Sequence, residues 1–164
     1  MATVKLQLNK VEIAQQQLDM ASKLYVMHEN VFSIHTLAGA AENILGGVLE
    51  RSENKKEESM FEKMRQAYSE LMGRPATATE VASLVNTSRN ALKHARNPGE
   101  DIFVYEPKDA EVMLLRALAN YQILTGALTD TMELCLTCLR SRSPEFLRAN
   151  LAKDDKGSMD SACS

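Results

Sequence analysis

Several residue types are scarce in this chain of 164 residues, and their scarcity narrows the fold class. Trp is absent, aromatic residues make up 5% of the chain, and there are only 7 Gly and 4 Pro. β-Sheets draw on aromatic and β-branched residues, and loop-rich folds draw on Gly and Pro. Ala, Leu, Glu, Gln, Met and Lys recur instead, so the composition predicts helices.

Long apolar runs and a disulfide framework are also missing. No stretch of about 18 apolar residues occurs, which argues against a membrane span or a membrane partner. Residues 1–5 lack the apolar core of a signal peptide. The three cysteines, Cys135, Cys138 and Cys163, are an odd number, which predicts free thiols in a reducing compartment. We therefore expect a cytoplasmic protein.

Positive charge is not in excess. The formal net charge is -3 and the isoelectric point is about 5.7. Proteins that bind nucleic acids non-specifically do so through a broad basic surface, which this chain does not have. Any site for nucleic acid must therefore be local.

Apolar residues recur at helical spacing along most of the chain. They predict an all-α fold: an antiparallel helical bundle of five or six helices. Residues 1–150 are expected to form one domain, and the small, polar segment 151–164 a disordered tail. The expected helices span residues 8–28, 31–50, 59–72, 79–97, 109–125 and 130–142, with Asn30, Thr79, Gly73 and Gly126 as boundary residues.

Two helices have informative faces. In the helix over 109–125, the predicted core face consists of Val112, Leu115, Ala119, Gln122 and Ile123. In the helix over 31–50, a polar and small stripe contains His35, Gly39, Glu42 and Gly46. Glycine inside a helix costs roughly 1 kcal/mol relative to alanine. Two interpretations follow: another helix approaches closely and satisfies His35 and Glu42, or the stripe lines a cleft in which Glu42 tunes a histidine.

The segment Arg89-Asn90-Ala91-Leu92-Lys93-His94 places an arginine, an amide and a histidine near the end of the helix over 79–97. Because each residue turns a helix by about 100°, Arg89 and His94 do not stack on each other. They border a polar arc instead, with Asn90 within hydrogen-bonding reach of His94. The centre of that arc contains Asn86, Asn90, Lys93 and Asn97, and the buried stripe contains Val81, Leu84, Val85, Ser88, Leu92 and Ala95.

These side chains suit cleavage of RNA by internal attack of the 2′-hydroxyl. A histidine titrates in the right range to take or give a proton. The arginine fork binds two phosphate oxygens and keeps its charge. A single His94 cannot easily serve both proton transfers, so the chemistry predicts a two-fold dimer with two such helices around one cleft. It needs no metal and no other cofactor.

The segment also resembles the R-x4-6-H motif of HEPN domains. Three segments, at residues 17–21, 35–42 and 91–95, are similar to a group of uncharacterised bacterial proteins. The resemblance implies a symmetric dimer that cleaves RNA without a metal, often with a protein partner such as an antitoxin. By the same resemblance, Arg89 binds phosphate, Asn90 is a positioning residue, and His94 is the acid or base. Some HEPN domains only bind nucleotides or partners.

Simpler explanations compete with each of these sites. A polar arc is expected on any solvated helix face, which leaves a non-catalytic helical interaction module as the alternative function. Cys135-x-x-Cys138 has the spacing of redox or zinc motifs. However, Met132, Cys135, Leu136 and Leu139 have core spacing, which favours buried thiols. We expect no metal site there, and no di-iron site, since no Glu-x-x-His pair occurs.

Overall fold

The computed structural model describes residues 7–52, 58–94 and 101–142. Over these ranges the chain forms seven helices and no strand, which confirms the predicted all-α class there. The predicted tail at 151–164 lies outside the described residues. The helices are α1 (Lys10–Val26), α2 (Val31–Arg51), α3 (Met60–Met72), α4 (Ala78–Val85), α5 (Thr87–Lys93), α6 (Pro107–Thr125) and α7 (Asp130–Arg142).

Local sequence signals fix most helix ends. The side chain of Asn30 accepts a hydrogen bond from the Ser33 N–H at 2.9 Å and caps α2, as the sequence predicted. Gly73 and Gly126 end α3 and α6 in the left-handed conformation, with φ of 63° and 81°. Glycine adopts this conformation without a steric cost, so these two predicted ends are confirmed.

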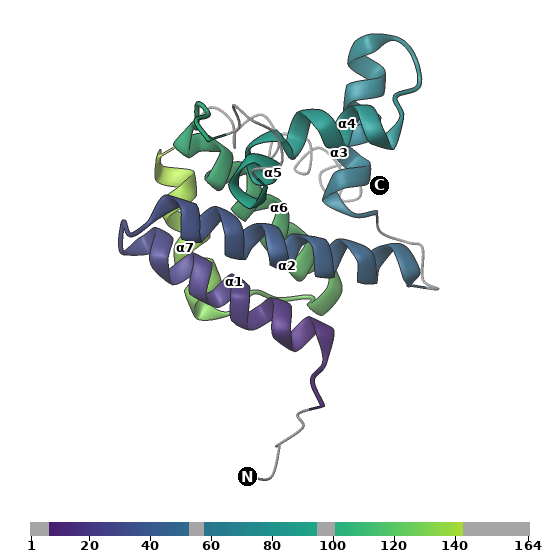
Figure 1. Cartoon of the computed structure of the whole chain (residues 1–164). Coiled ribbons are helices and arrows are strands. Elements are labelled where there is room, and N and C mark those ends of the chain that lie inside the picture. The colour runs from purple at the N-terminus through teal and green to yellow at the C-terminus, as the bar shows by residue number, and fades with distance from the viewer. Residues whose placement is uncertain (1–6, 53–57, 95–100, 143–164) are drawn as a thin grey trace, which may run out of the picture.

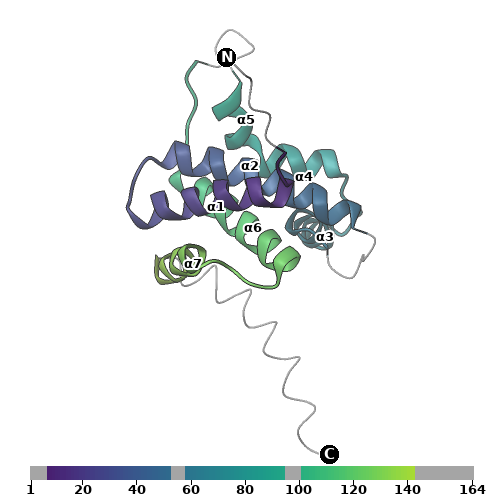
Figure 2. The ribbon, with the colours of Figure 1, turned by 90° about the horizontal axis from the view of Figure 1, so that it is seen from below.

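Four helices share the main core. α1 and α2 lie side by side in opposite directions, and α6 packs against both (Figure 1). α7 packs on α1, and α5 lies on the other side of the molecule, against α2 (Figure 2). The largest fully buried apolar side chains are Leu18, Leu45, Met113, Leu114, Leu118, Met132 and Leu139, which come from α1, α2, α6 and α7.

The predicted core face of α6 is wrong. Gln122 is exposed, and Val112, Leu115, Ala119 and Ile123 are only partly buried. The helix has neighbours on several sides (α1, α2, α3 and α7), so its buried surface is wider than one apolar stripe. The buried residues are Ala110, Met113, Leu114, Arg116, Ala117, Leu118, Asn120 and Tyr121. Two polar side chains, Arg116 and Asn120, therefore face the interior.

The predicted helix over 79–97 is two helices, α4 and α5, and the second ends at Lys93. The break is at Asn86, whose backbone leaves the helical region at φ -115° and ψ 8°. Asparagine favours helix caps over helix interiors, because its side chain competes for backbone hydrogen bonds. Leu84, predicted to be buried, is 57% exposed, although it lies in the same helix as buried Val81.

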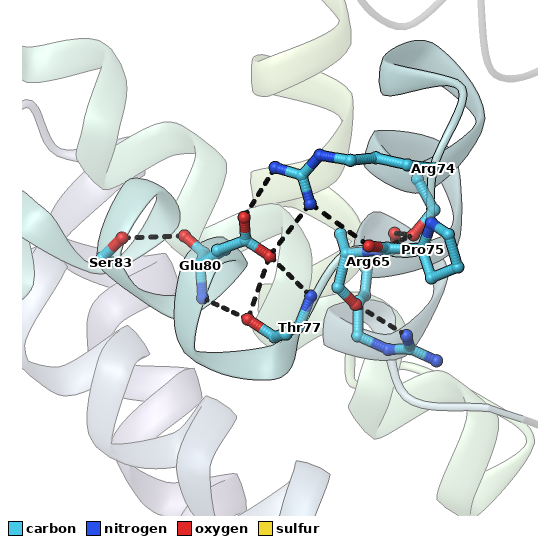
Figure 3. A network of polar contacts seen from close by, with 8 residues as sticks. Arg65, Arg74, Pro75, Thr77, Glu80 and Ser83 are labelled. Atoms are coloured by element: carbon cyan, nitrogen blue, oxygen red, sulfur yellow. Dashed lines mark hydrogen bonds and ion pairs between the residues drawn. The ribbon is translucent and has the colours of Figure 1, made fainter.

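α3 and α4 lie beside this core (Figure 1), and a network of polar contacts joins them (Figure 3). The Arg65 Nη1 donates to the carbonyl oxygen of Ala76 at 3.0 Å, and Arg74 Nη2 pairs with Glu80 Oε1 at 2.7 Å. Thr77 and Glu80 form a capping box at the start of α4. The predicted start at Thr79 was therefore two residues late, since Thr77 is the residue with a glutamate three positions on.

Candidate functional site

The side chain of Arg89 enters the protein and crosses α2. Arg89 is 7% exposed, and its guanidinium lies over Gly39. A Cβ at Gly39 would lie 2.9 Å from Arg89 Nε, so the glycine is what admits the arginine. The Nη1 group donates to Asn43 Oδ1 at 2.9 Å. Asn43 itself is exposed, so the buried arginine is bonded to a residue of the surface.

One turn of α2 away, Glu42 pairs with Arg116 of α6. The Arg116 Nη2 to Glu42 Oε1 distance is 2.7 Å, and both side chains are almost fully buried. The Nη1 of Arg116 also donates to Asn86 Oδ1 at 3.2 Å. Glu42 thus pairs with an arginine, where one sequence hypothesis had it tune a histidine. Arg116 ties the α4–α5 junction to α2, and its role was not predicted.

Arg89, Glu42 and Arg116 form a seam along α2, in which positive charge exceeds negative charge. The pKa of Arg89 is lowered, first by burial and then by the charge of Arg116, while Glu42 opposes the shift. The pKa of Lys93 is lowered by desolvation and by Arg89. Two guanidiniums therefore share one buried carboxylate, and the Nε of each has no hydrogen-bond partner among the described residues. Both Nε groups are buried, so each is a desolvated donor that no hydrogen bond from those residues compensates.

His35, at the start of the α2 stripe, is buried and lies apart from Glu42. Its Nδ1 is 2.9 Å from the hydroxyl of Tyr105, and its Nε2 has no partner among the described residues. Burial lowers the pKa of His35, Asp109 raises it, and Arg89, Arg116 and Lys93 lower it further. Burial and Asp109 also raise the pKa of Tyr105 to about 12. His35 is therefore a neutral imidazole at pH 7.

The rest of the motif faces solvent. Asn90, Lys93 and His94 are exposed, and α5 ends where the His94 N–H donates to the Asn90 carbonyl at 3.1 Å. The two side chains, predicted to be within reach, form no hydrogen bond in the described part of the chain. Asn97 lies outside the described residues. The six-residue segment is thus divided: a buried, fixed arginine and an exposed amide, lysine and histidine.

A groove of about 240 Å³ opens beside the Glu42–Arg116 pair. α2 forms one wall with Asn43 and Gly46, and Phe61 and Asn86 form the other. Asn43 therefore touches both the groove and Arg89. A separate cavity of about 110 Å³ lies between His35, Ser88 and Asp109, and Ser88 donates a hydrogen bond to Asp109.

The two cysteines of α7 were the other candidate site in the sequence. Of the two thiols predicted to be buried, Cys135 is buried, and burial raises its pKa to about 12, whereas Cys138 is only partly buried. No group of three or more His, Cys, Asp or Glu side chains in the part of the chain described is arranged to hold a metal ion. None of the described helices combines the length and apolar character needed to cross a membrane.

Comparisons with protein-family models, with curated proteins and with solved structures find no match to this chain. The site therefore rests on its own geometry. Sequence reasoning identified Arg89 and Glu42 but missed Asn43, Tyr105, Arg116 and Asn120. The sequence contains a pattern that could have identified two of these residues. Arg116 and Asn120 are four residues apart and share a helical face with the apolar Met113 and Ala117.

Proposed function

We propose that this protein is a HEPN-like helical bundle that acts as a dimer to bind RNA and cleave it without a metal. One observation carries the proposal: α5 fixes the Arg89 guanidinium in the α2 seam and presents Asn90 and His94 to solvent within the next turn. A fixed cation can stabilise the charge that develops on phosphorus, and an exposed histidine can transfer a proton.

The reaction is an internal transesterification. The 2′-oxygen attacks the adjacent phosphorus as one His94 imidazole removes its proton. The bond from phosphorus to the 5′-oxygen breaks, and the second His94, from the other subunit, donates a proton to that oxygen. The products are a 2′,3′-cyclic phosphate and a 5′-hydroxyl, and no oxidant or cofactor is consumed. Arg89 stabilises the negative charge on the phosphorane-like transition state.

Local electrostatics support binding in spite of the net charge of -3. The seam contains one more guanidinium than carboxylate, and exposed Lys93 adds to it. Excess positive charge at low dielectric attracts phosphate more strongly than the same charge in water. The Nη1 of Arg89 donates to the exposed Asn43, and we expect the phosphate to bind beside this pair.

The test is cleavage of RNA by purified protein. We expect fragments with cyclic phosphate ends, and a loss of rate of about 10²- to 10⁴-fold for His94→Ala, the usual worth of an acid or base. His28→Ala is the matched control, because His28 is also exposed but lies at the α1–α2 turn. An RNA pool that stays intact with wild-type protein, or cleavage that His94→Ala leaves unchanged, refutes the proposal.

A non-catalytic interaction module is the second candidate, and the burial of Arg89 favours it. Its side chain packs on Gly39 and bonds to Asn43, so it also serves to attach α5 to α2. Exposed Leu71, Met72 and Leu84 give α3 and α4 an apolar surface suited to a protein partner. In this case, Arg89→Ala lowers thermal stability, and wild-type protein leaves RNA intact.

A further inference from the structure

The groove beside the Glu42–Arg116 pair has the features of a binding site for a small, flat, polar molecule. Its volume of about 240 Å³ is below the range of pockets for drug-sized ligands, roughly 300–1,000 Å³, but sufficient for one heterocyclic ring system. Gly46 forms part of its α2 wall, where the backbone carries no side chain. Phe61, at the start of α3, also lines this space.

Polar groups with unused hydrogen-bonding capacity surround this groove. Arg116 lines it, is 3% exposed, and its Nε has no partner in the described chain. Asn120 lies behind Gly46: its Nδ2 would lie 3.7 Å from a Cβ there and has no hydrogen-bond partner among the residues that the structure describes. Asn43 and Asn86 add amide groups at the rim. Buried donors without partners are costly unless a ligand or water satisfies them.

The charges of the groove distinguish it from a phosphate site. Glu42 and Glu50 contribute two carboxylates and Arg116 one guanidinium, so the lining is negative overall. A phosphate is repelled there, whereas a neutral ring with both donors and acceptors is not. Aromatic stacking with hydrogen bonds to ring edges is the way proteins recognise unpaired nucleobases.

We propose that this groove binds an unpaired nucleobase of the RNA, with Phe61 stacking on it and the amides of Asn43 and Asn86 contacting its edges. Asn43 lines the groove and accepts the hydrogen bond from Arg89, so base and scissile phosphate are held by neighbouring groups. Binding a base here positions the phosphate for attack. This inference rests on the proposed function, and names the part of the substrate that gives sequence preference.

The test uses uncharged nucleosides and the full-length protein. Adenosine, guanosine, cytidine and uridine are titrated separately while the amide resonances of Gly46 and Gly47 are followed by NMR. We expect saturable shifts with at least one nucleoside and none with ribose 5-phosphate, which lacks a base. Phe61→Leu keeps the apolar bulk but removes the stacking ring, and weakens binding about tenfold, the worth of one base–aromatic stack. Phe32→Leu is the matched control, because Phe32 is a partly exposed phenylalanine on α2 that does not line the groove.

The outcomes separate the two proposals. Nucleoside shifts that depend on Phe61, together with intact RNA, support the groove and refute cleavage. Cleaved RNA whose fragment pattern is the same in wild type and Phe61→Leu, with no nucleoside shift, overturns the groove and leaves cleavage standing. A response of Gly46 and Gly47 to a lysine-rich peptide but to no nucleoside also overturns it, and points to a protein ligand.

Discussion

Gly39 is the residue on which the position of Arg89 depends, because a side chain there collides with the arginine. In Gly39→Ala, the new Cβ lies 2.9 Å from Nε and 3.1 Å from Cδ of Arg89. The buried arginine has to move, and overpacking of this kind costs about 1–3 kcal/mol. We expect a lower unfolding free energy in urea, and loss of any RNA binding that uses Arg89.

Gly47→Ala is the matched control, eight residues along the same helix. Nothing lies within 4 Å of a Cβ at Gly47, so only helix propensity changes. Alanine gains roughly 1 kcal/mol over glycine in a helix, and this variant should be more stable than wild type. Equal stability changes in the two variants would contradict the role given to Gly39.

His35 makes stability depend on pH near neutrality. Burial lowers its pKa in the folded protein below the usual 6.5, so between these values the unfolded chain binds more protons than the folded chain. The stabilisation is complete above pH 6.5 and is lost as pH falls towards the lowered pKa. Each unit of difference is worth about 1.4 kcal/mol. Melting temperatures between pH 8 and pH 5 should therefore fall, and His35→Gln should flatten that slope.

Several charged groups around His35 contribute to this pH dependence, so the control is a histidine elsewhere in the protein. Asp109 favours the protonated imidazole, whereas Arg89, Arg116 and Lys93 disfavour it. His94 is exposed at the end of α5, so His94→Gln should keep the wild-type slope. If both glutamine variants melt with the wild-type pH dependence, His35 is not its source.

At the scale of single elements, α4 depends on its capping box (Figure 3). The side chain of Thr77 accepts from the Glu80 N–H at 3.2 Å, and Glu80 accepts from the Thr77 N–H at 2.8 Å. Thr77→Ala should lower stability by about 0.5–2 kcal/mol, and Thr77→Ser, which keeps the hydroxyl, by much less. Thermal unfolding measures both.

The same box responds to acid. Hydrogen bonds from Arg74 and Thr77 lower the pKa of Glu80 to about 2 from its usual 4.5. The stabilisation from Glu80 is therefore present above pH 4.5 and lost as pH falls towards 2. The destabilisation caused by Thr77→Ala should shrink over that range, because protonated Glu80 no longer maintains the box. A constant difference from pH 6 to pH 2.5 would argue against this coupling.

How well the sequence predicted these elements depended on the kind of signal. Asn30, Gly73 and Gly126 act through their own backbone and side chain, and their positions were correct. The break at Asn86 was missed because it depends on Arg116, thirty residues away, which donates to the Asn86 side chain. The core face of α6 was wrong for a related reason: a helix with neighbours on several sides has no single apolar stripe. Tertiary contacts decide these features, and helical periodicity does not contain them.

For the whole molecule, the candidate site was half predictable. For the stripe of His35, Gly39, Glu42 and Gly46, close approach of another helix was one of two interpretations that the sequence left open. That the approaching group is the Arg89 side chain, and that Glu42 pairs with Arg116, follows only from how α5 and α6 are placed. The predicted arc of polar residues on one continuous helix is absent, because the helix breaks at Asn86. The six-residue segment instead combines a buried arginine with an exposed amide, lysine and histidine.

The number of subunits in one active cleft is the property that tests the proposal at the level of the whole molecule. If cleavage requires the His94 of both subunits, a dimer with one His94→Ala chain is inactive. Wild-type and His94→Ala chains are mixed one to one, unfolded in urea and refolded together. By random pairing, roughly a quarter of the resulting dimers then contain two wild-type chains. RNA cleavage should then fall to about a quarter of that of wild type at the same total concentration. Independent sites would give about half. A mixture with His28→Ala chains should keep full activity, since that substitution leaves both His94 side chains in place.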